Sequence, residues 1–177
     1  MIPLPSLSET IAPVAEALDQ APFEERVNWM RGLGKKELVA LWKLTEGRAV
    51  PADYFDSPEV VIHEGQNSLL LFNQFQKRIV RFGDQIQGYN HQTMAWITGP
   101  GHFYVHPGDG ASYFDYTRLV PKAPDAFPPV ADNMAGFSRF VYGNTIDKLH
   151  RVSEKSVIGA AFRNDKPIGA YFMLQKP

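Results

Sequence analysis

Residues 155–176 read KSVIGAAFRNDKPIGAYFMLQK, and this stretch decides the fold class of the chain. It consists of two short runs rich in apolar and aromatic residues, separated by the turn sequence RNDKP (163–167). Asn, Asp and Pro between two such runs are typical of a β-hairpin. The stretch therefore predicts two antiparallel strands at the end of the chain.

Segments of the same kind recur from residue 85 onward. They are QIQGYNHQTMAWITG (85–99), HFYVHPG (102–108), ASYFDYTRL (111–119) and FSRFVYG (137–143). Roughly five to seven short strands in succession predict an antiparallel meander, which closes or curls into a barrel to hide its edges. NTIDKLHRV (144–152) fits either a strand or a short helical turn, in which Asp147 and Arg151 would pair. The Pro-rich residues 121–136 predict a long connection over a rim.

The first part of the chain has helical patterns instead. Leu7, Ile11 and Val14 recur at helical spacing after a start at SLSE (6–9), although Pro13 predicts a kink or a later start. Two more helices are predicted over PFEERVNWMRGLG (22–34) and KKELVALWKLTEG (35–47), and EVVIH (59–63) is a strand candidate. SLLLFNQFQKRIVRFG (68–83) favours a helix, because its apolar residues are spaced by three or four positions.

The composition fits one folded domain, residues 1–177, with 44% hydrophobic and 21% charged residues. The expected fold is α+β: a mainly helical part, 1–84, and an antiparallel β part, 85–177, that closes into a barrel-like sheet. The absence of cysteine excludes disulfides, thiolate catalysis and cysteine-ligated zinc. A net charge of −1 argues against nucleic acid and anionic membranes as partners. The N-terminus has no signal-peptide pattern, so we expect a cytoplasmic protein.

Residues 88–118 alternate aromatic and hydrogen-bonding side chains, and this pattern marks the candidate site. Apolar walls with a few placed polar groups are what a small-molecule pocket needs, whereas solvated polar faces would give the same pattern. A histidine and a carboxylate on adjacent strands could serve as acid and base, or could be held in purely structural hydrogen bonds. The candidate catalytic residues are His91, Tyr89 and Asp115, and the candidate ligand-binding residues are Trp96, Met94, Tyr104, His102, Tyr116, Arg118 and Tyr142.

The histidines of this region do not predict a metal site. His102 and His106 have a spacing that suits a helix, but Gly and Pro on both sides exclude a stable helix. On a strand the two side chains lie roughly 13 Å apart and cannot share a metal ion. His91 could meet one of them across a hairpin, but no carboxylate is placed beside such a pair. The glycine-rich, nucleophile-elbow and zinc-protease motifs are also absent from the sequence, so we expect neither a metal nor another cofactor.

The end of the chain resembles a known bacterial family. In RFVYGNTIDKLHRVSEKSVIGAAFRNDKPIGAYFMLQK (139–176), the matching elements are Val141-Tyr142, Ile146-Asp147, Arg151-Val152, Ile158-Gly159 and Tyr171-Phe172-Met173-Leu174. They are similar to the C-terminal domain of a family of unknown function, which usually follows a domain named for its GxWxG motif. ALWKLTEGR (40–48) keeps Trp42 and Gly47 but lacks that motif. The resemblance implies a small β-rich, lipocalin-like domain and supplies no catalytic residues.

We therefore expect the protein to bind a small apolar or aromatic molecule in an aromatic-lined β-barrel pocket. If the pocket is catalytic, the predicted reaction is a cofactor-independent isomerisation or cyclisation, promoted by shape and a few polar groups. The alternative is a protein–protein interaction module or homodimer without catalytic activity. Its surface would include exposed aromatic residues and the Pro-rich residues 121–136, with Phe127 or Phe137 in the interface.

Overall fold

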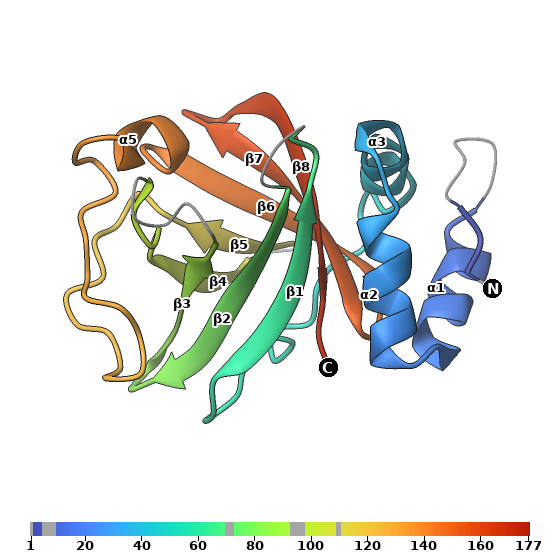
Figure 1. The fold of residues 1–177 in the computed structure, drawn as a ribbon, viewed down its shortest axis with the longest axis horizontal. Helices are drawn as coiled ribbons and strands as arrows, with labels where there is room; N and C mark the ends of the chain where they lie inside the picture. Colours follow the sequence, from blue (N-terminus) through green and yellow to red (C-terminus); the bar gives the residue numbers. More distant parts are fainter. Residues whose placement is uncertain (1, 5–9, 70–72, 93–97, 109–110) are drawn as a thin grey trace.

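The computed structural model contains four helices and eight strands in the part of the chain that it describes (Figure 1). The described residues are 2–4, 10–69, 73–92, 98–108 and 111–177. The helices are α1 (Ala12–Gln20), α2 (Phe23–Arg31), α3 (Lys35–Leu44) and the short α5 (Ser138–Val141). The strands are β1 (Val61–Asn67), β2 (Gln74–Phe82), β3 (Gln85–His91), β4 (Phe103–Gly108), β5 (Ala111–Asp115), β6 (Thr145–Ser153), β7 (Ser156–Arg163) and β8 (Lys166–Gln175).

The strands form one closed antiparallel barrel in which each strand pairs with its neighbours in sequence. β1 closes the barrel by pairing with β8, where Gly65 lies opposite Leu174. Closure satisfies the backbone N–H and C=O groups that edge strands would leave unpaired. In the predicted hairpin turn between β7 and β8, Asn164 and Asp165 have φ angles of 49° and 61°. The predicted α+β fold with an antiparallel, barrel-like sheet is confirmed.

The helix expected over residues 68–83 is wrong, because Gln74–Phe82 form the strand β2. Phe75 and Ile79 pack in the barrel interior, whereas Val80 packs against the outer face. A strand whose two faces are both covered carries apolar residues on each face, so their spacing can imitate that of a helix. The sheet consequently starts with β1, and the helical part of the chain is shorter than the expected 1–84.

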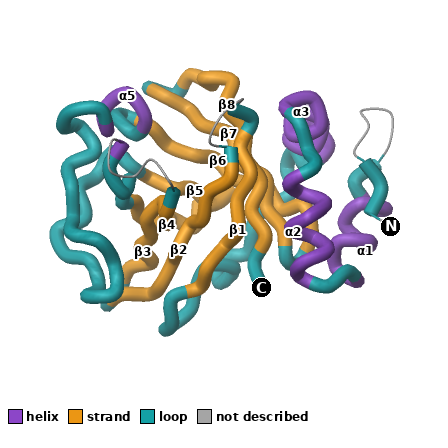
Figure 2. Tube along the Cα trace, in the orientation of Figure 1, coloured by secondary structure: helices purple, strands orange, loops and turns teal. Residues whose placement is uncertain are grey.

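Helices α1, α2 and α3 cover the outer face of the barrel at β6, β7 and β8 (Figures 1 and 2). There, Leu18 and Met30 of the helices belong to one apolar cluster with Ile158 of the sheet. The three predicted helices are confirmed. α1 begins at Ala12, later than the SLSE start, because Pro13 lacks an N–H and is tolerated only in the first turn.

A buried arginine ties these helices to the last strand. Arg26 donates hydrogen bonds to the backbone oxygens of Ala21 (2.8 Å) and Lys176 (2.7 Å) and to the side-chain oxygen of Gln175 (3.3 Å). Its side chain is buried, so these bonds replace the water that the guanidinium loses on folding. The helical layer is therefore fixed to the barrel by charge-assisted hydrogen bonds as well as by apolar packing.

The two ends of the barrel differ. One end is closed by the segment between α3 and β1, where Phe55 is buried with its ring centroid 5.2 Å from that of Phe114. The other end, here called the mouth, carries the β1–β2, β3–β4, β5–β6 and β7–β8 connections. α5 stands at the mouth beside the β7–β8 hairpin (Figure 1), where Arg163 donates a hydrogen bond to the backbone oxygen of Phe140 at 2.8 Å. The strand expected over residues 137–143 is wrong, because this helix forms there instead. The interior is therefore reached from the mouth.

The Pro-rich residues 121–136 lie over the outer face of β3 and β4. Phe127 is buried against Tyr89, with ring centroids 4.7 Å apart. Asn133 donates a hydrogen bond from its side chain to the backbone oxygen of His102 at 2.8 Å. The expected connection over a rim is thus a cover for one side of the sheet. Phe127, expected in the interface of an interaction module, is buried within its own chain.

Candidate functional site

A cavity of about 370 Å³ opens at the mouth of the barrel. Its walls come from β1, β2, β3, β6, β7, β8 and the connection that contains α5, so the cavity exists only when the barrel has closed. Apolar side chains form much of the wall, and a group of polar side chains lies among them. The lining residues that matter below are Phe75, Lys77, Asn90, Tyr116, Tyr142, Asp147, Ala170 and Phe172.

Lys77 lies at the inner end of this cavity and contacts three polar side chains. Its Nζ donates hydrogen bonds to Asn90 Oδ1 at 2.8 Å and to Tyr116 Oη at 2.5 Å, and Asp147 Oδ2 lies 3.6 Å away. The Tyr116 hydroxyl in turn donates to Asp147 Oδ2 at 3.3 Å. These four side chains, here called the interior polar cluster, come from β2, β3, β6 and the residue that follows β5.

Aromatic rings surround the ammonium group of Lys77. Its Nζ lies 4.7 Å from the ring centroids of both Phe103 and Phe114 and 5.0 Å from that of Phe172. The faces of aromatic rings attract a cation, which offsets part of the cost of removing the ammonium group from water. Gly159 leaves room for one of these rings, because a Cβ at this position would lie 2.2 Å from Phe172.

Burial controls the ionisation of the interior polar cluster. Removal from water lowers the pKa of Lys77 to about 8, although the attraction of Asp147 opposes this shift. The same burial raises the pKa of Asp147 above its ordinary value, although Lys77 and Tyr116 oppose this shift. Burial also raises the pKa of Tyr116, so its hydroxyl stays protonated. The charged form of the Lys77–Asp147 pair is therefore favoured over the neutral form by less free energy than it would be in water.

Two predicted ligand-binding residues, Tyr116 and Tyr142, lie in this cavity. Their rings are stacked with centroids 5.3 Å apart. The Tyr142 hydroxyl accepts a hydrogen bond from the Gln92 side chain at 2.9 Å, and burial raises the pKa of Tyr142 to about 12. Tyr142 is thus neutral at physiological pH. Met94 and Trp96, which we also expect to bind ligand, lie outside the described residues.

Tyr89, His91 and His102 face away from the cavity, contrary to their expected place in the pocket. In β3, the alternation that turns Asn90 inward turns Tyr89 and His91 outward. Tyr89 and His102 are buried against Phe127, whereas His91 is exposed. Alternation in a sequence shows which residues share a face, but it does not show which face lies inside.

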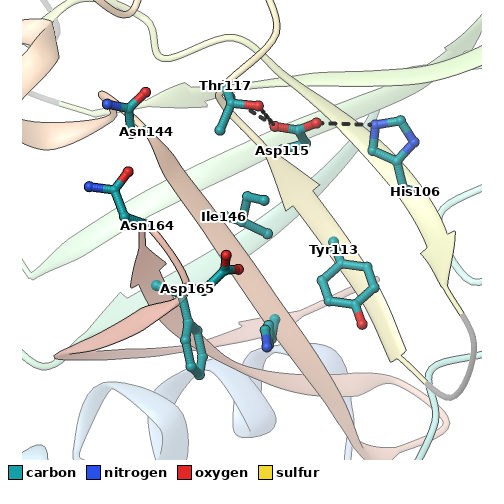
Figure 3. A pocket seen from close by; sticks show the side chains of 10 residues that line it. His106, Tyr113, Asp115, Thr117, Asn144, Ile146, Asn164 and Asp165 are labelled. Atoms are coloured by element: carbon teal, nitrogen blue, oxygen red, sulfur yellow. Dashed lines mark hydrogen bonds and ion pairs between the residues drawn. The ribbon is translucent and has the colours of Figure 1, made fainter.

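Tyr104, Arg118 and Asp115 also lie on the outer face of the barrel. The Arg118 guanidinium is 5.3 Å from the ring centroid of Tyr104. Asp115 Oδ2 lies 3.5 Å from His106 Nε2, and Asp115 Oδ1 accepts hydrogen bonds from the backbone and hydroxyl of Thr117 at 2.8 and 2.6 Å (Figure 3). The expected pairing of Asp115 with a β3 histidine on an adjacent strand does not occur, because β4 separates β3 from β5.

Asp115 and His106 line a second cavity, of about 530 Å³, on the outer face of the barrel (Figure 3). Ile146 lies between this pair and the β7–β8 turn that contributes Asp165, and Tyr113 lines the cavity on the side below His106 (Figure 3). This outer groove is the larger cavity, but its His106 side chain is 40% exposed. The mouth cavity is the better candidate because its charged pair is buried, and buried ionisable groups in a cavity mark functional sites more often than solvated ones.

Lys77 and Asp147 are candidate functional residues that the sequence patterns do not place in a pocket. The helix expected over 68–83 puts Lys77 on a solvated face, and a helical turn at 146–152 pairs Asp147 with Arg151. In the structure Asp147 points into the barrel, and Arg151 instead contacts Glu154 at 2.9 Å. The available signal is the alternation of Phe75, Lys77 and Ile79 along one strand face, which places a charge between two apolar residues.

The described part of the chain holds no group of three or more His, Asp or Glu side chains that could together bind a metal ion. Among the helices in these same residue ranges, none has both the length and the apolar character needed to cross a membrane. Comparisons of the chain with protein-family models, curated proteins and solved structures give no match. A functional proposal must therefore be argued from the site itself.

Proposed function

We propose that the protein binds a small, largely apolar organic molecule in the mouth cavity, with a polar group of that molecule directed at the interior polar cluster. The observation that carries this proposal is the buried Lys77–Asp147 pair in an aromatic-lined cavity. Removing a charged pair from water costs several kcal/mol per ion, and an apolar replacement is often at least as stable. Folding alone therefore gives little reason to keep such a pair.

The lining of the cavity sets the chemical class of the ligand. Phe75 and Phe172 offer ring surface, and burial of apolar ligand surface against them contributes about 25 cal/mol per Å². At the inner end, the interior polar cluster supplies both hydrogen-bond donors and acceptors, which fix the orientation of a ligand more than its affinity. A ring system with one oxygen function at its end matches both features.

If the bound molecule is converted, Lys77, Tyr116 and Asp147 are the groups placed to move protons. They are joined by hydrogen bonds or ion-pair contacts, and they require no cofactor for an isomerisation or a cyclisation. The catalytic role expected for His91, Tyr89 and Asp115 would require a ligand on the outer face of the barrel instead.

Binding of the fluorescent dye anilinonaphthalene sulfonate tests the proposal. Ala170→Phe places a ring in the wall of the mouth cavity and is expected to abolish saturable binding of the dye. Ile146→Phe makes the same kind of change in the outer groove and is expected to leave binding unaffected. Failure of the wild type to bind saturably, or loss of binding in Ile146→Phe alone, would contradict the proposal. Circular dichroism checks that each variant is folded.

Self-association through α5 is a second candidate function, favoured by two exposed aromatic side chains. Phe137 is 67% exposed and Phe140 is 61% exposed, with ring centroids 6.2 Å apart. Adjacent exposed rings of this kind are common where proteins contact one another. We expect light scattering to show a dimer that dissociates in Phe137→Ser if this candidate is correct. A monomer at every protein concentration would reject it.

A further inference from the structure

We propose that Lys77 is a nucleophile that holds a carbonyl compound as a covalent imine at the inner end of the mouth cavity. This inference rests on the proposed function, because it names the class of ligand and the bond formed in the same cavity. Its basis is the position of the amine, the hydrogen bonds around it and the aromatic rings that face it.

The position of Lys77 separates it from ordinary surface lysines. Its side chain is only 3% exposed, yet it lines the mouth cavity. A ligand that enters from the mouth would pass Phe75 and Phe172 before its leading group meets Nζ. An aldehyde or ketone group at the end of an aromatic body would thus reach the amine while the body stays against apolar walls.

The hydrogen bonds around Lys77 give a route for the proton that an amine must lose before it attacks a carbonyl carbon. Nζ donates to Tyr116 Oη, and the same hydroxyl donates to Asp147 Oδ2. Transfer of a proton from Nζ to Oη, with the hydroxyl proton passed on to Oδ2, leaves a neutral amine, a phenol and a carboxylic acid. Two opposite charges disappear together, so the net charge of the interior polar cluster is unchanged. The burial that lowers the pKa of Lys77 and raises that of Asp147 favours this transfer.

The reaction balances with these groups alone. The neutral amine of Lys77 forms a C–N bond to the carbonyl carbon, and one N–H proton moves to the carbonyl oxygen to give a carbinolamine. Asp147 returns its proton through Tyr116 to the carbinolamine hydroxyl, the C–O bond breaks, and water leaves. The product is a protonated imine beside the Asp147 carboxylate. Nothing is oxidised or reduced.

The surroundings of Nζ stabilise this product relative to an imine on the surface. A protonated imine is a cation, so the faces of Phe103 and Phe114 that attract the ammonium group attract it as well. The apolar walls also limit access of the water that would hydrolyse the imine. The pKa of Lys77, about 8, supports the assignment. Near pH 7 such a lysine is neutral in a fraction on the order of 100-fold larger than a lysine of ordinary pKa.

Reductive trapping with benzaldehyde tests the proposal. The full chain is incubated with benzaldehyde and sodium cyanoborohydride near neutral pH, and the modified lysines are located by peptide mass spectrometry. We expect the reduced adduct to form at Lys77 at least about tenfold faster than at the exposed Lys36 and Lys166. Equal rates at all three lysines, or no adduct at Lys77, would overturn the proposal. The wild-type chain alone therefore decides it, whatever the stability of the variants.

Two variants and one ligand refine the test. Lys77→Met is expected to give no adduct in the cavity, and Tyr116→Phe is expected to slow trapping at Lys77 by about tenfold or more, because it removes the relay but keeps the amine. Benzyl alcohol has no carbonyl group and reports binding alone. Suppose that benzyl alcohol binds the wild type and does not bind Ala170→Phe, but benzaldehyde does not label Lys77. The covalent proposal then fails, whereas the proposed binding function stands. If neither binding nor labelling occurs, both fail.

Discussion

His63 is expected to make the barrel sensitive to acid. Its imidazole is 1% exposed near the closed end of the barrel, with its ring centroid 5.3 Å from that of Phe55. Within the described residues, neither ring nitrogen makes a well-aligned hydrogen bond, although the backbone groups of Val61 and Lys77 lie close enough to affect the ring. Burial lowers the pKa of His63 to about 4, and the positive charges of Lys176 and Lys77 act in the same direction, while nearby backbone groups oppose them in part. The ring is therefore neutral at physiological pH.

The size and direction of the effect follow from proton linkage. An unfolded histidine has a pKa of about 6.5. Between that value and the lower folded value, the unfolded chain binds more protons than the folded chain. The stability contributed by the neutral ring is therefore complete above about pH 6.5 and is lost as the pH falls toward 4. A pKa lowered to about 4 corresponds to about 3 kcal/mol of free energy of unfolding. That is a large part of the roughly 5–15 kcal/mol that stabilises a typical domain.

Urea denaturation at several pH values from 7 to 4 measures this loss in the wild type and in His63→Leu. Leucine is similar in size, apolar, and has no proton to bind. The carboxylates titrate in both proteins, as do His102 and His150, whose pKa values are also lowered by burial. These contributions cancel in the comparison. We expect the wild type to lose about 3 kcal/mol more than His63→Leu over this range. Parallel pH profiles for the two proteins would refute the reasoning.

Other substitutions test the packing of the fold. Arg26→Met removes three hydrogen bonds, two of them buried and one partly buried, and is expected to cost about 3 kcal/mol or more in urea denaturation. Arg31→Met removes only a surface contact at 3.4 Å and should cost less than about 1 kcal/mol; equal costs would contradict this account. Gly159→Ala forces a Cβ against Phe172, so we expect a loss of about 1–3 kcal/mol. Asp165→Gly, at a φ of 61° in a hairpin turn, should raise Tm, and a lower Tm would count against the turn assignment.

Local features of the fold are predictable from sequence because their causes are local. The turn at Asn164 and Asp165 ends one strand and starts the next, whatever the rest of the chain does. Pro13 delays the start of α1 for an equally local reason, its missing N–H. β2 shows where this approach fails. Its two faces are covered by partners distant in sequence, so both faces carry apolar residues. The spacing of these residues therefore does not show the two-residue repeat that identifies a strand.

The candidate site depends on contacts that no local pattern contains. Lys77 and Tyr116 are 39 residues apart in sequence and meet only because the barrel closes. Alternation correctly separates Tyr89 and His91 from Asn90 and Gln92, but the choice of inner face is made by the whole sheet. Here the face with fewer aromatic residues in β3 is the interior one, because residues 121–136 cover the other face.

Lys77 and His63 share the barrel interior, and their different partners explain why only one of them is charged at neutral pH. Lys77 has Asp147 and several ring faces around its ammonium group, whereas His63 has an aromatic neighbour and the positive charge of Lys77 acting on it. An imine on Lys77 keeps its positive charge when protonated, so it should leave the pKa of His63 unchanged. A ligand that carries an anion to Lys77 would instead offset that charge and raise the pKa of His63. The acid sensitivity of the loaded protein thus separates a bound carbonyl compound from a bound carboxylate.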